Sequence, residues 1–379
     1  MGEKPDWGEL EAYQQTITRA EFVDLLDRVY APGGTWHEVI TLHEDRAEVK
    51  TTDGKAPWVL RFAPSRADAT AVPAKWRSKA QLPPPLAKKP LEGLRIAIDP
   101  GHIGGKWAKI EERWFQVGKA KPVTEGDMTL LVAKKLEKQL AALGAKVYLT
   151  REKDTPTTSD RPEKLTQTAR QALAERGARA TEDALRREAN RLFYRVSEIR
   201  KRADLVNEKI RPDLVLCLHF NAESWGNEKR PRLVNDNHLH FLVTGAWSAD
   251  ELAYEDQRFE MLMKLLGRTF PEELAVTRAV METMVRDTGL PPYTYAGSNA
   301  VKVSDSPYIW GRNLLANRLF RSPTVYLEPY VMNSRAVHDR IQAGDYDGVR
   351  TFDGVKRKSI FREYADSVVA GLVNYYSER

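Results

Sequence analysis

Two short apolar runs in this chain have the pattern of β-strands, and a histidine follows each of them. Residues 94–98 alternate between apolar and other side chains, the period of a half-buried strand, and a Pro-Gly turn places His102 just beyond them. Residues 214–218, Leu-Val-Leu-Cys-Leu, form a continuous apolar run typical of a fully buried strand, and His219 follows directly. Because ligands of open α/β sheets bind beyond the carboxyl ends of the strands, both histidines are candidate metal ligands.

Two carboxylates extend this pattern. Residues 324–327 are a third strand candidate followed by Glu328, which would be costly to keep charged at the end of a buried strand unless it faced a cation or a polar pocket. Glu125 opens a predicted helix, where the alternative role is that of an N-terminal residue favoured by the helix dipole. Glu111 and Glu112 are rival carboxylates without a helix start to fix their direction. The two histidines, Glu125 and Glu328 together define a metal-site hypothesis.

The spacing of apolar residues predicts the fold class. Residues 128–143 carry apolar side chains at three- and four-residue intervals, which predicts an amphipathic helix ending near Gly144. Residues 146–150 return as a strand and complete a right-handed βαβ unit. His238 and His240 lie on one face of another alternating strand; they could bind a metal together, but polar-out alternation explains them more simply. We therefore expect an α/β protein with a mostly parallel twisted sheet flanked by helices.

The chain of 379 residues is long enough for two domains, and its first part predicts a small α+β accessory domain at residues 1–81. A helix is expected at residues 19–30, and strands at residues 37–43, 46–51 and 58–62. The proline-rich stretch 82–90 interrupts all periodicity, which is typical of a stiff linker. The larger catalytic domain is then expected at residues 91–379.

A helical insertion is predicted at about residues 155–201 of that larger domain. Its apolar residues step alternately by four and three in a heptad-like stripe that comprises Leu185, Ala189, Leu192, Val196, Ile199, Ala203 and Val206. Arginines, Arg202 among them, occupy the rest of the helix. The simplest interpretation is a long solvated helix whose apolar seam docks on the sheet or on residues 165–173. The alternative is a lid or a partner-binding arm.

The motifs resemble, in their order along residues 91–379, those of zinc-dependent N-acetylmuramoyl-L-alanine amidases. These motifs are Ile98-Asp-Pro-Gly-His102, Glu125 at the head of a Leu-rich helix, Tyr148-Leu-Thr-Arg151, Leu218-His-Phe-Asn-Ala222 and Tyr326-Leu-Glu-Pro-Tyr-Val-Met-Asn333. The resemblance implies that His102, Glu125 and His219 bind Zn²⁺ and that Glu328 is the catalytic base. Asn221 is expected to orient the substrate or Glu328 from the same strand end. Three positions depart from the family pattern, namely Ile103, Gly126 and Pro329, and they flank these residues without replacing them.

The implied activity is hydrolysis of the amide between N-acetylmuramic acid and L-alanine in peptidoglycan. Two other functions stay open: a zinc amidohydrolase or carboxypeptidase acting on another cell-wall peptide, and a non-catalytic cell-wall binding protein. In some of these amidases an inserted helix covers the zinc until a protein activator moves it. Autoinhibition by the helical insertion, relieved by such an activator, is therefore a hypothesis for this chain.

Composition limits the remaining possibilities. The net charge of +6 permits attraction to any polyanion, but there is no glycine-rich phosphate loop or basic-aromatic module, so we do not expect nucleic-acid binding. No run of eighteen apolar residues exists, so no transmembrane segment is expected. Cys217 is the single cysteine, which excludes an internal disulfide. The amino terminus lacks the pattern of an export signal, yet the implied wall substrate favours a periplasmic or extracellular protein whose signal is not part of this sequence.

Overall fold

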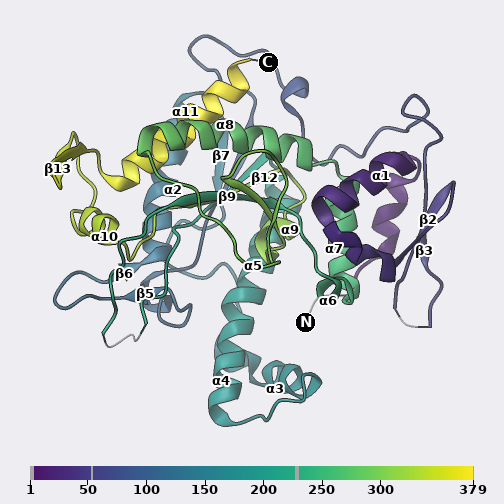
Figure 1. Ribbon diagram of the computed structural model, residues 1–379, viewed down its shortest axis with the longest axis horizontal. Helices are drawn as coiled ribbons and strands as arrows, with labels where there is room; N and C mark the ends of the chain where they lie inside the picture. The colour runs from purple at the N-terminus through teal and green to yellow at the C-terminus, as the bar shows by residue number, and fades with distance from the viewer. Residues whose placement is uncertain (1–3, 53, 227–229, 379) are drawn as a thin grey trace.

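A seven-stranded twisted sheet between two layers of helices organises the computed structural model, which describes residues 4–52, 54–226 and 230–378 (Figure 1). Across the sheet the strands are β10 (Val301–Lys302), β11 (Ile309–Arg312), β9 (Leu239–Thr244), β12 (Thr324–Pro329), β8 (Leu214–Leu218), β4 (Arg95–Pro100) and β7 (Lys146–Leu149). Strands β7, β4, β8 and β12 are parallel, β9 is antiparallel to β12, and β11 is parallel to β9. The predicted mostly parallel sheet flanked by helices is confirmed.

The helices of one layer carry the largest part of the apolar core. They are α2 (Glu125–Ala142), α8 (Phe270–Thr288) and α11 (Ile360–Ser377). The β4–α2–β7 segment forms the predicted βαβ unit with parallel strands. On the opposite face the sheet is covered by α5 (Glu198–Asp204) and α9 (Leu315–Leu319), which pack on a second, smaller apolar cluster.

The amino-terminal part forms the expected small α+β unit, with α1 (Arg19–Leu25) and an antiparallel sheet of β1 (Ile40–Leu42), β2 (Arg46–Val49) and β3 (Trp58–Arg61). It packs against α6 (Ala249–Leu252) and α7 (Glu255–Leu266). The carbonyls of Val29 and Tyr30 accept hydrogen bonds from the N–H groups of Ala246 and Trp247 at 2.8 and 2.7 Å. Since apolar residues on both sides of 82–90 share one core, the domain boundary stays a prediction from sequence.

The predicted helical insertion projects from the sheet as an arm, seen at the bottom of Figure 1. It contains α3 (Thr166–Glu175) and α4 (Glu182–Arg191), and α4 continues through a π-helical segment, Leu192–Ser197, into α5. Leu185, Ala189 and Leu192 pack on Leu165 and Ala169. Ala203 and Val206 pack on the sheet beside Val215. The apolar seam therefore docks on both expected surfaces, one after the other along the helix.

Shorter elements complete the fold. They are β5 (Trp114–Phe115) paired with β6 (Val123–Thr124), α10 (Arg335–Gln342), and the hairpin of β13 (Arg350–Phe352) and β14 (Val355–Arg357). No helix in the described part of the chain combines the length and the apolar character needed to cross a membrane.

Candidate metal centre

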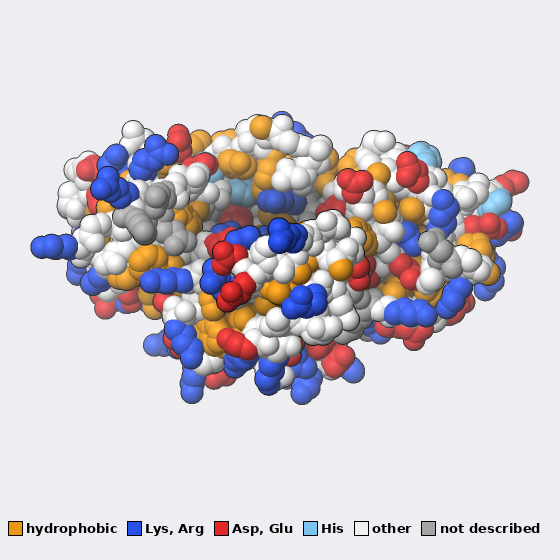
Figure 2. Space-filling model, turned by 90° about the horizontal axis from the view of Figure 1, so that it is seen from below, with side chains coloured by type: hydrophobic (Ala, Val, Ile, Leu, Met, Phe, Trp, Pro, Cys, Tyr) orange, Lys and Arg blue, Asp and Glu red, His pale blue; other side chains and the backbone are white. Residues whose placement is uncertain are grey.

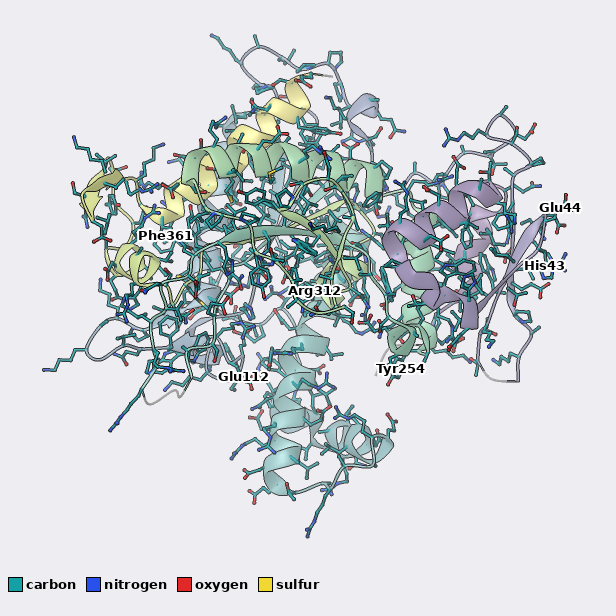
Figure 3. All side chains as sticks on the ribbon, viewed as in Figure 1. His43, Glu44, Glu112, Tyr254, Arg312 and Phe361 are labelled. Carbon is teal, nitrogen blue, oxygen red and sulfur yellow. The ribbon has the colours of Figure 1, made fainter. Side chains whose placement is uncertain are left out.

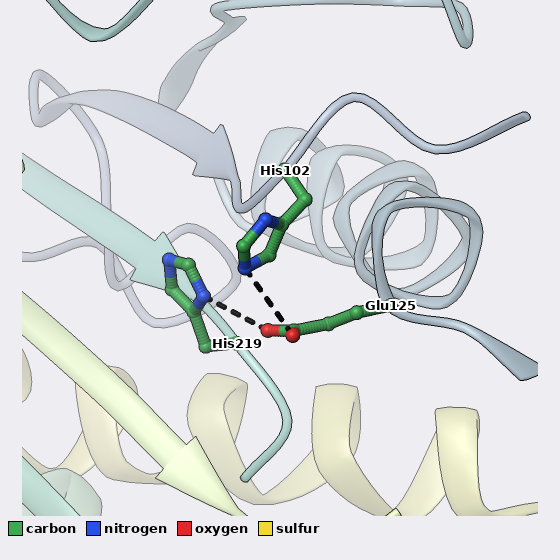
Figure 4. A group of neighbouring side chains, drawn as sticks. All are labelled: His102, Glu125 and His219. Atoms are coloured by element: carbon green, nitrogen blue, oxygen red, sulfur yellow. Dashed lines mark hydrogen bonds and ion pairs between the residues drawn. The ribbon is translucent and has the colours of Figure 1, made fainter. Parts of the chain in front are cut away.

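Two strand ends and one helix start bring three candidate ligands together. Because β4 and β8 are parallel neighbours, His102 and His219 follow their carboxyl ends at the same edge of the sheet, and Glu125 is the first residue of α2. Glu125 Oε2 lies 3.2 Å from His102 Nε2, and Glu125 Oε1 lies 2.9 Å from His219 Nδ1 (Figure 4). The carboxylate thus bridges the two imidazoles.

This group has the chemistry of a divalent-cation site. One ligand atom from each of His102, Glu125 and His219 lies within 4.8 Å of the others, and within the described ranges no other cluster of histidine, cysteine, aspartate and glutamate meets this criterion. Two imidazoles and one carboxylate are a ligand set of zinc hydrolases, in which a further position is left to water or substrate. The group also lines a cavity, so such a position would be reachable.

Glu111 contacts the ring nitrogen of His102 that does not face Glu125. Its carboxylate lies 3.5 Å from His102 Nδ1 and accepts hydrogen bonds from the N–H groups of Ile103 and Gly104 at 2.8 and 3.0 Å. A carboxylate behind a ligand histidine fixes the orientation of its ring. Glu112, the other rival carboxylate, is exposed and lies 4.0 Å from Arg195. Sequence alone did not indicate the position of Glu111, because it belongs to no regular element.

The electrostatics of the group couple metal binding to protons. Burial alone would lower the pKa of His102, but Glu125 and Glu111 outweigh it and raise the pKa to about 9. Burial alone would raise the pKa of Glu125, but His102 and His219 hold it well below its usual range. A metal ligand must be a neutral imidazole, so binding of a cation displaces the His102 proton and weakens as the pH falls.

The His219 ring is fixed by close packing on two sides. It stacks on the Tyr326 ring with centroids 4.5 Å apart. On the other side lies Gly101, where an added Cβ would sit 2.3 Å from His219 Cε1 and 2.6 Å from Nδ1. A side chain at position 101 is therefore incompatible with this position of the imidazole.

Gly101→Ala is accordingly expected to displace the His219 ring and to weaken zinc binding about 10- to 100-fold, the range found when partners of metal ligands are changed. Competition with a chromogenic chelator measures this affinity. Gly297→Ala is the matched control, because its nearest neighbour, Asn299 Oδ1, would be 3.4 Å from the new Cβ. Equal zinc affinities of the two variants would contradict the packing argument.

Three arginines hold the surroundings of the ligands in place, and sequence reasoning assigned none of them a role. Arg113 Nε lies 3.1 Å from Glu125 Oε2. Arg151 donates to the carbonyl of Gly126, the residue after Glu125, at 2.6 Å. Arg202 donates to the His102 carbonyl at 2.9 Å.

Arg202 corrects the expectation of a solvated arginine, because only 3% of its surface is exposed. It donates to the Pro100 carbonyl at 2.8 Å and pairs with Asp99 at 3.1 Å. The sequence did contain a sign of this burial, because Arg202 directly precedes Ala203, a residue of the apolar seam. The helix that continues the arm is thereby tied directly to the His102 turn.

The structure also accounts for two departures from the family pattern. Ile103 is fully buried against Phe193 and Tyr194 of the arm, so the apolar side chain serves the docking of the insertion. At Gly126 an added Cβ would lie 2.3 Å from the Gly104 nitrogen, so a side chain there would push the loop after His102 away from the start of α2. Pro329 ends β12, opposite Leu239.

A cavity of about 720 Å³ opens beside the ligand group. It runs between the base of the arm and residues 312–316, and Figure 2, which views the molecule from below, shows a hollow behind the arm. Glu328 and Asn221 both line this cavity. Asn221 Nδ2 lies 3.4 Å from His238 Nδ1, while its Oδ1 accepts from the Ala222 N–H at 2.7 Å.

Glu328 sits opposite His240 in the β12–β9 pair. Burial raises its pKa above the usual range; His219 opposes this rise and Glu125 adds to it. Among the described residues Glu328 has no hydrogen bond or ion pair, so its carboxylate is free to act in the cavity.

The other candidate residues take structural positions. His238 and His240 do share one face, but both are buried rather than solvent-facing, which corrects the polar-out interpretation. His238 Nε2 lies 3.2 Å from Glu223 and His240 Nε2 lies 2.9 Å from the Tyr295 hydroxyl, away from the ligand group. Several aromatic side chains pack on other residues of the protein and do not line the cavity; they are Trp107, Trp114, Phe115, Tyr293, Tyr295 and Trp310.

An open α/β sheet with two histidines and a carboxylate gathered at the carboxyl ends of its strands defines a hydrolase-like protein with a candidate metal site. The chain belongs to the N-acetylmuramoyl-L-alanine amidase family, because the Amidase_3 model of that family matches residues 96–348. The predicted resemblance is confirmed, and the protein is a peptidoglycan amidase by family. No protein in a curated collection matches the chain.

Solved structures of amidases resemble the chain at low identity. The CwlD amidase of Clostridioides difficile, solved with the GerS lipoprotein, is 13% identical, with 76% of this chain and 100% of that chain covered and a TM-score of 0.42. Ami1 of Mycobacterium abscessus is 16% identical over 75% and 99% of the two chains, with a TM-score of 0.39. The catalytic domain of CwlV from Bacillus (Paenibacillus) polymyxa is 16% identical over 74% and 97%, with a TM-score of 0.38.

Proposed function

We propose that the protein is a zinc-dependent amidase that hydrolyses the amide between the lactyl group of N-acetylmuramic acid and L-alanine. The observation that carries this proposal is the convergence of His102, Glu125 and His219 in one cavity that Glu328 also lines. Packing alone would not require two imidazoles and two carboxylates from four distant segments to meet at one edge of a sheet.

In this proposal His102, Glu125 and His219 hold the cation, and Glu111 keeps the His102 ring in place. A Zn²⁺ ion bound there supplies Lewis-acid polarisation of the scissile carbonyl and of the attacking water. The two histidines offer neutral nitrogens once His102 has lost its proton.

Glu328 is the proposed general base. Its carboxylate takes a proton from the attacking water and then delivers that proton to the leaving amine of L-alanine. A carboxyl group whose pKa is raised by burial suits both transfers, because its proton affinity lies closer to neutral pH. Asn221, on the cavity wall, is proposed to contact the substrate.

The arm is proposed as the surface on which a protein activator acts. Its helix lines the cavity through Tyr194 and Arg195, and Arg202 ties it to the His102 turn, so movement of the arm would alter both the entrance and the ligand loop. A peptidoglycan substrate also implies work in the periplasm or outside the cell.

Mass spectrometry of digested cell-wall sacculi tests the proposed activity. The zinc-loaded protein is expected to release free peptides that begin with L-alanine and to leave intact N-acetylmuramic acid. Loss of a carboxy-terminal amino acid from peptides still linked to the glycan would indicate a carboxypeptidase instead. Retention on sacculi without any product would indicate a binding protein, and either result would contradict the proposal.

A further inference from the structure

One of the four arginines that line the cavity has no carboxylate partner. Arg113 pairs with Glu125 and Arg202 pairs with Asp99, at 3.1 Å in both cases. Arg195 lies 4.0 Å from Glu112 at the cavity rim. Arg312, by contrast, forms no ion pair with any carboxylate of the described residues. A permanently charged guanidinium left unpaired in a cavity is a ready site for an anion.

The guanidinium of Arg312 is held by a buried relay. His240 Nε2 and the Tyr295 hydroxyl are 2.9 Å apart, and Arg312 Nη1 donates to the same hydroxyl at 3.3 Å. Burial lowers the pKa of His240 to about 3, so its ring is neutral and Nε2 accepts the Tyr295 proton. The Arg312 guanidinium also lies 5.4 Å from the centre of the Tyr295 ring. Arg312 is thus positioned rather than freely solvated.

The relay also places Arg312 relative to the proposed reaction centre. His240 is the direct cross-strand neighbour of Glu328 in the antiparallel β12–β9 pair, and such neighbours share a face of the sheet. One cross-strand step and the two hydrogen bonds give a span on the order of 10 Å between the Glu328 carboxylate and the guanidinium, the length of about two to three extended residues. Figure 3 shows Arg312 and Glu112 near the base of the arm.

The chemistry of the proposed substrate identifies the anion. On the glycan side of the scissile amide the groups are neutral hydroxyls and acetamides, whereas peptides carry carboxylates. An anion about two residues from the reaction centre must therefore belong to the peptide.

The geometry points to Arg312 as the residue that selects the peptide: it binds a carboxylate carried by the first or second residue after the L-alanine. This inference rests on the proposed amidase function. It adds a specificity determinant on β11, a strand that supplies none of the candidate metal ligands.

Three synthetic substrates test the inference. Each is an N-acetylmuramoyl tripeptide beginning with L-alanine and ending in a carboxamide; one is neutral, one carries a carboxylate on its second residue, and one carries it on its third. For the zinc-loaded wild type, kcat/KM for the better acidic substrate should exceed that for the neutral one by about 10- to 100-fold, the range of a charge-assisted hydrogen bond. Arg312→Gln should bring this ratio close to one, and Arg312→Lys should retain part of it.

A matched control and a binding measurement complete the test. Arg195→Gln removes the same charge from another element that lines the cavity and should leave the ratio unchanged, which separates a specific contact from general attraction. Calorimetric binding of the acidic tripeptide to Glu328→Gln, with and without Arg312→Gln, gives a readout that needs no turnover.

An acid-to-neutral ratio that is near one in the wild type, or that survives Arg312→Gln, would overturn this inference alone. Failure of the wild type to cleave all three substrates would instead contradict the proposed function. Should Arg312→Gln not fold, as judged by circular dichroism, Arg312→Lys and Tyr295→Phe decide: an unchanged ratio in both variants overturns the inference.

Discussion

Glu328→Gln is expected to lower kcat by about 10²- to 10⁴-fold, the usual contribution of a general base, while the protein keeps its bound zinc. Glutamine fills the same space beside β9 but cannot accept the proton of the attacking water. Because Glu328 is not among the three clustered ligand residues, its replacement should leave metal content unchanged. The measurement is the rate of muropeptide cleavage together with metal analysis of the same sample.

Glu112→Gln provides the control for this substitution. It makes the same chemical change in the lining of the same cavity, where the carboxylate of the exposed Glu112 lies 4.0 Å from Arg195, and it should retain nearly full activity. Equal losses in both variants would indicate a general effect of cavity charge. Full activity of Glu328→Gln would remove the proposed base.

Glu328→Gln should also change how the free energy of unfolding of the metal-free protein depends on pH. The pKa of Glu328 is raised in the folded state, so its ionised form is disfavoured there, and the folded state loses stability as the pH rises above the usual range of a carboxyl group. Glu328→Gln removes this penalty. Its free energy of unfolding should therefore equal or exceed that of the wild type at neutral pH, and the advantage should vanish in acid.

Removal of the metal should abolish hydrolysis, and stoichiometric Zn²⁺ should restore it. The reason is that a cation held by His102, Glu125 and His219 would supply the Lewis acid that polarises the attacking water and the scissile carbonyl. Bound zinc should also stabilise the folded state, by about 4 kcal/mol when free zinc is a thousandfold above its Kd. Thermal unfolding of the zinc-loaded protein should therefore begin at a higher temperature. Dialysis against a chelator followed by titration with Zn²⁺ measures both effects.

Two histidine variants give this experiment its control. His219→Ala should neither retain zinc nor regain activity, because one of three ligands is lost. His238→Ala removes a buried histidine that lies near Glu223 and should still bind one zinc. Restoration of His219→Ala by zinc would show that the cation is held elsewhere.

The part of the site that sequence predicted depends on regular elements. The strands before His102 and His219 and the helix headed by Glu125 are visible from apolar periodicity, and parallel strands bring their carboxyl ends to one edge. The approximate place of the ligand group therefore follows from local patterns. Glu328 follows in the same way from the buried strand β12.

The support of the site could not be predicted in this way. Glu111 reaches His102 from an irregular loop, and Arg113 reaches Glu125 from the residue before β5. Their positions depend on long-range packing that leaves no period in the sequence. Arg202 was assigned to solvent because it is charged, although its neighbours on the seam are buried; the carbonyls of the His102 turn make that burial favourable.

In the arm, too, periodicity predicted some contacts and missed others. Its apolar stripe predicted a docking seam correctly, since Leu192 packs on α3 and Val206 packs on the sheet. The stripe did not predict that Ile103, beside a ligand, is buried against Phe193 of the arm. That contact depends on how the helix crosses the loop, which periodicity does not encode.

The central claim is that His102, Glu125 and His219 bind one divalent cation. A crystal of the zinc-loaded protein, measured on both sides of the zinc absorption edge, tests it most directly. We predict one anomalous peak about 2 Å from a nitrogen of each histidine and an oxygen of Glu125, the usual zinc–ligand distance. A peak elsewhere, or none at full zinc loading, would contradict it.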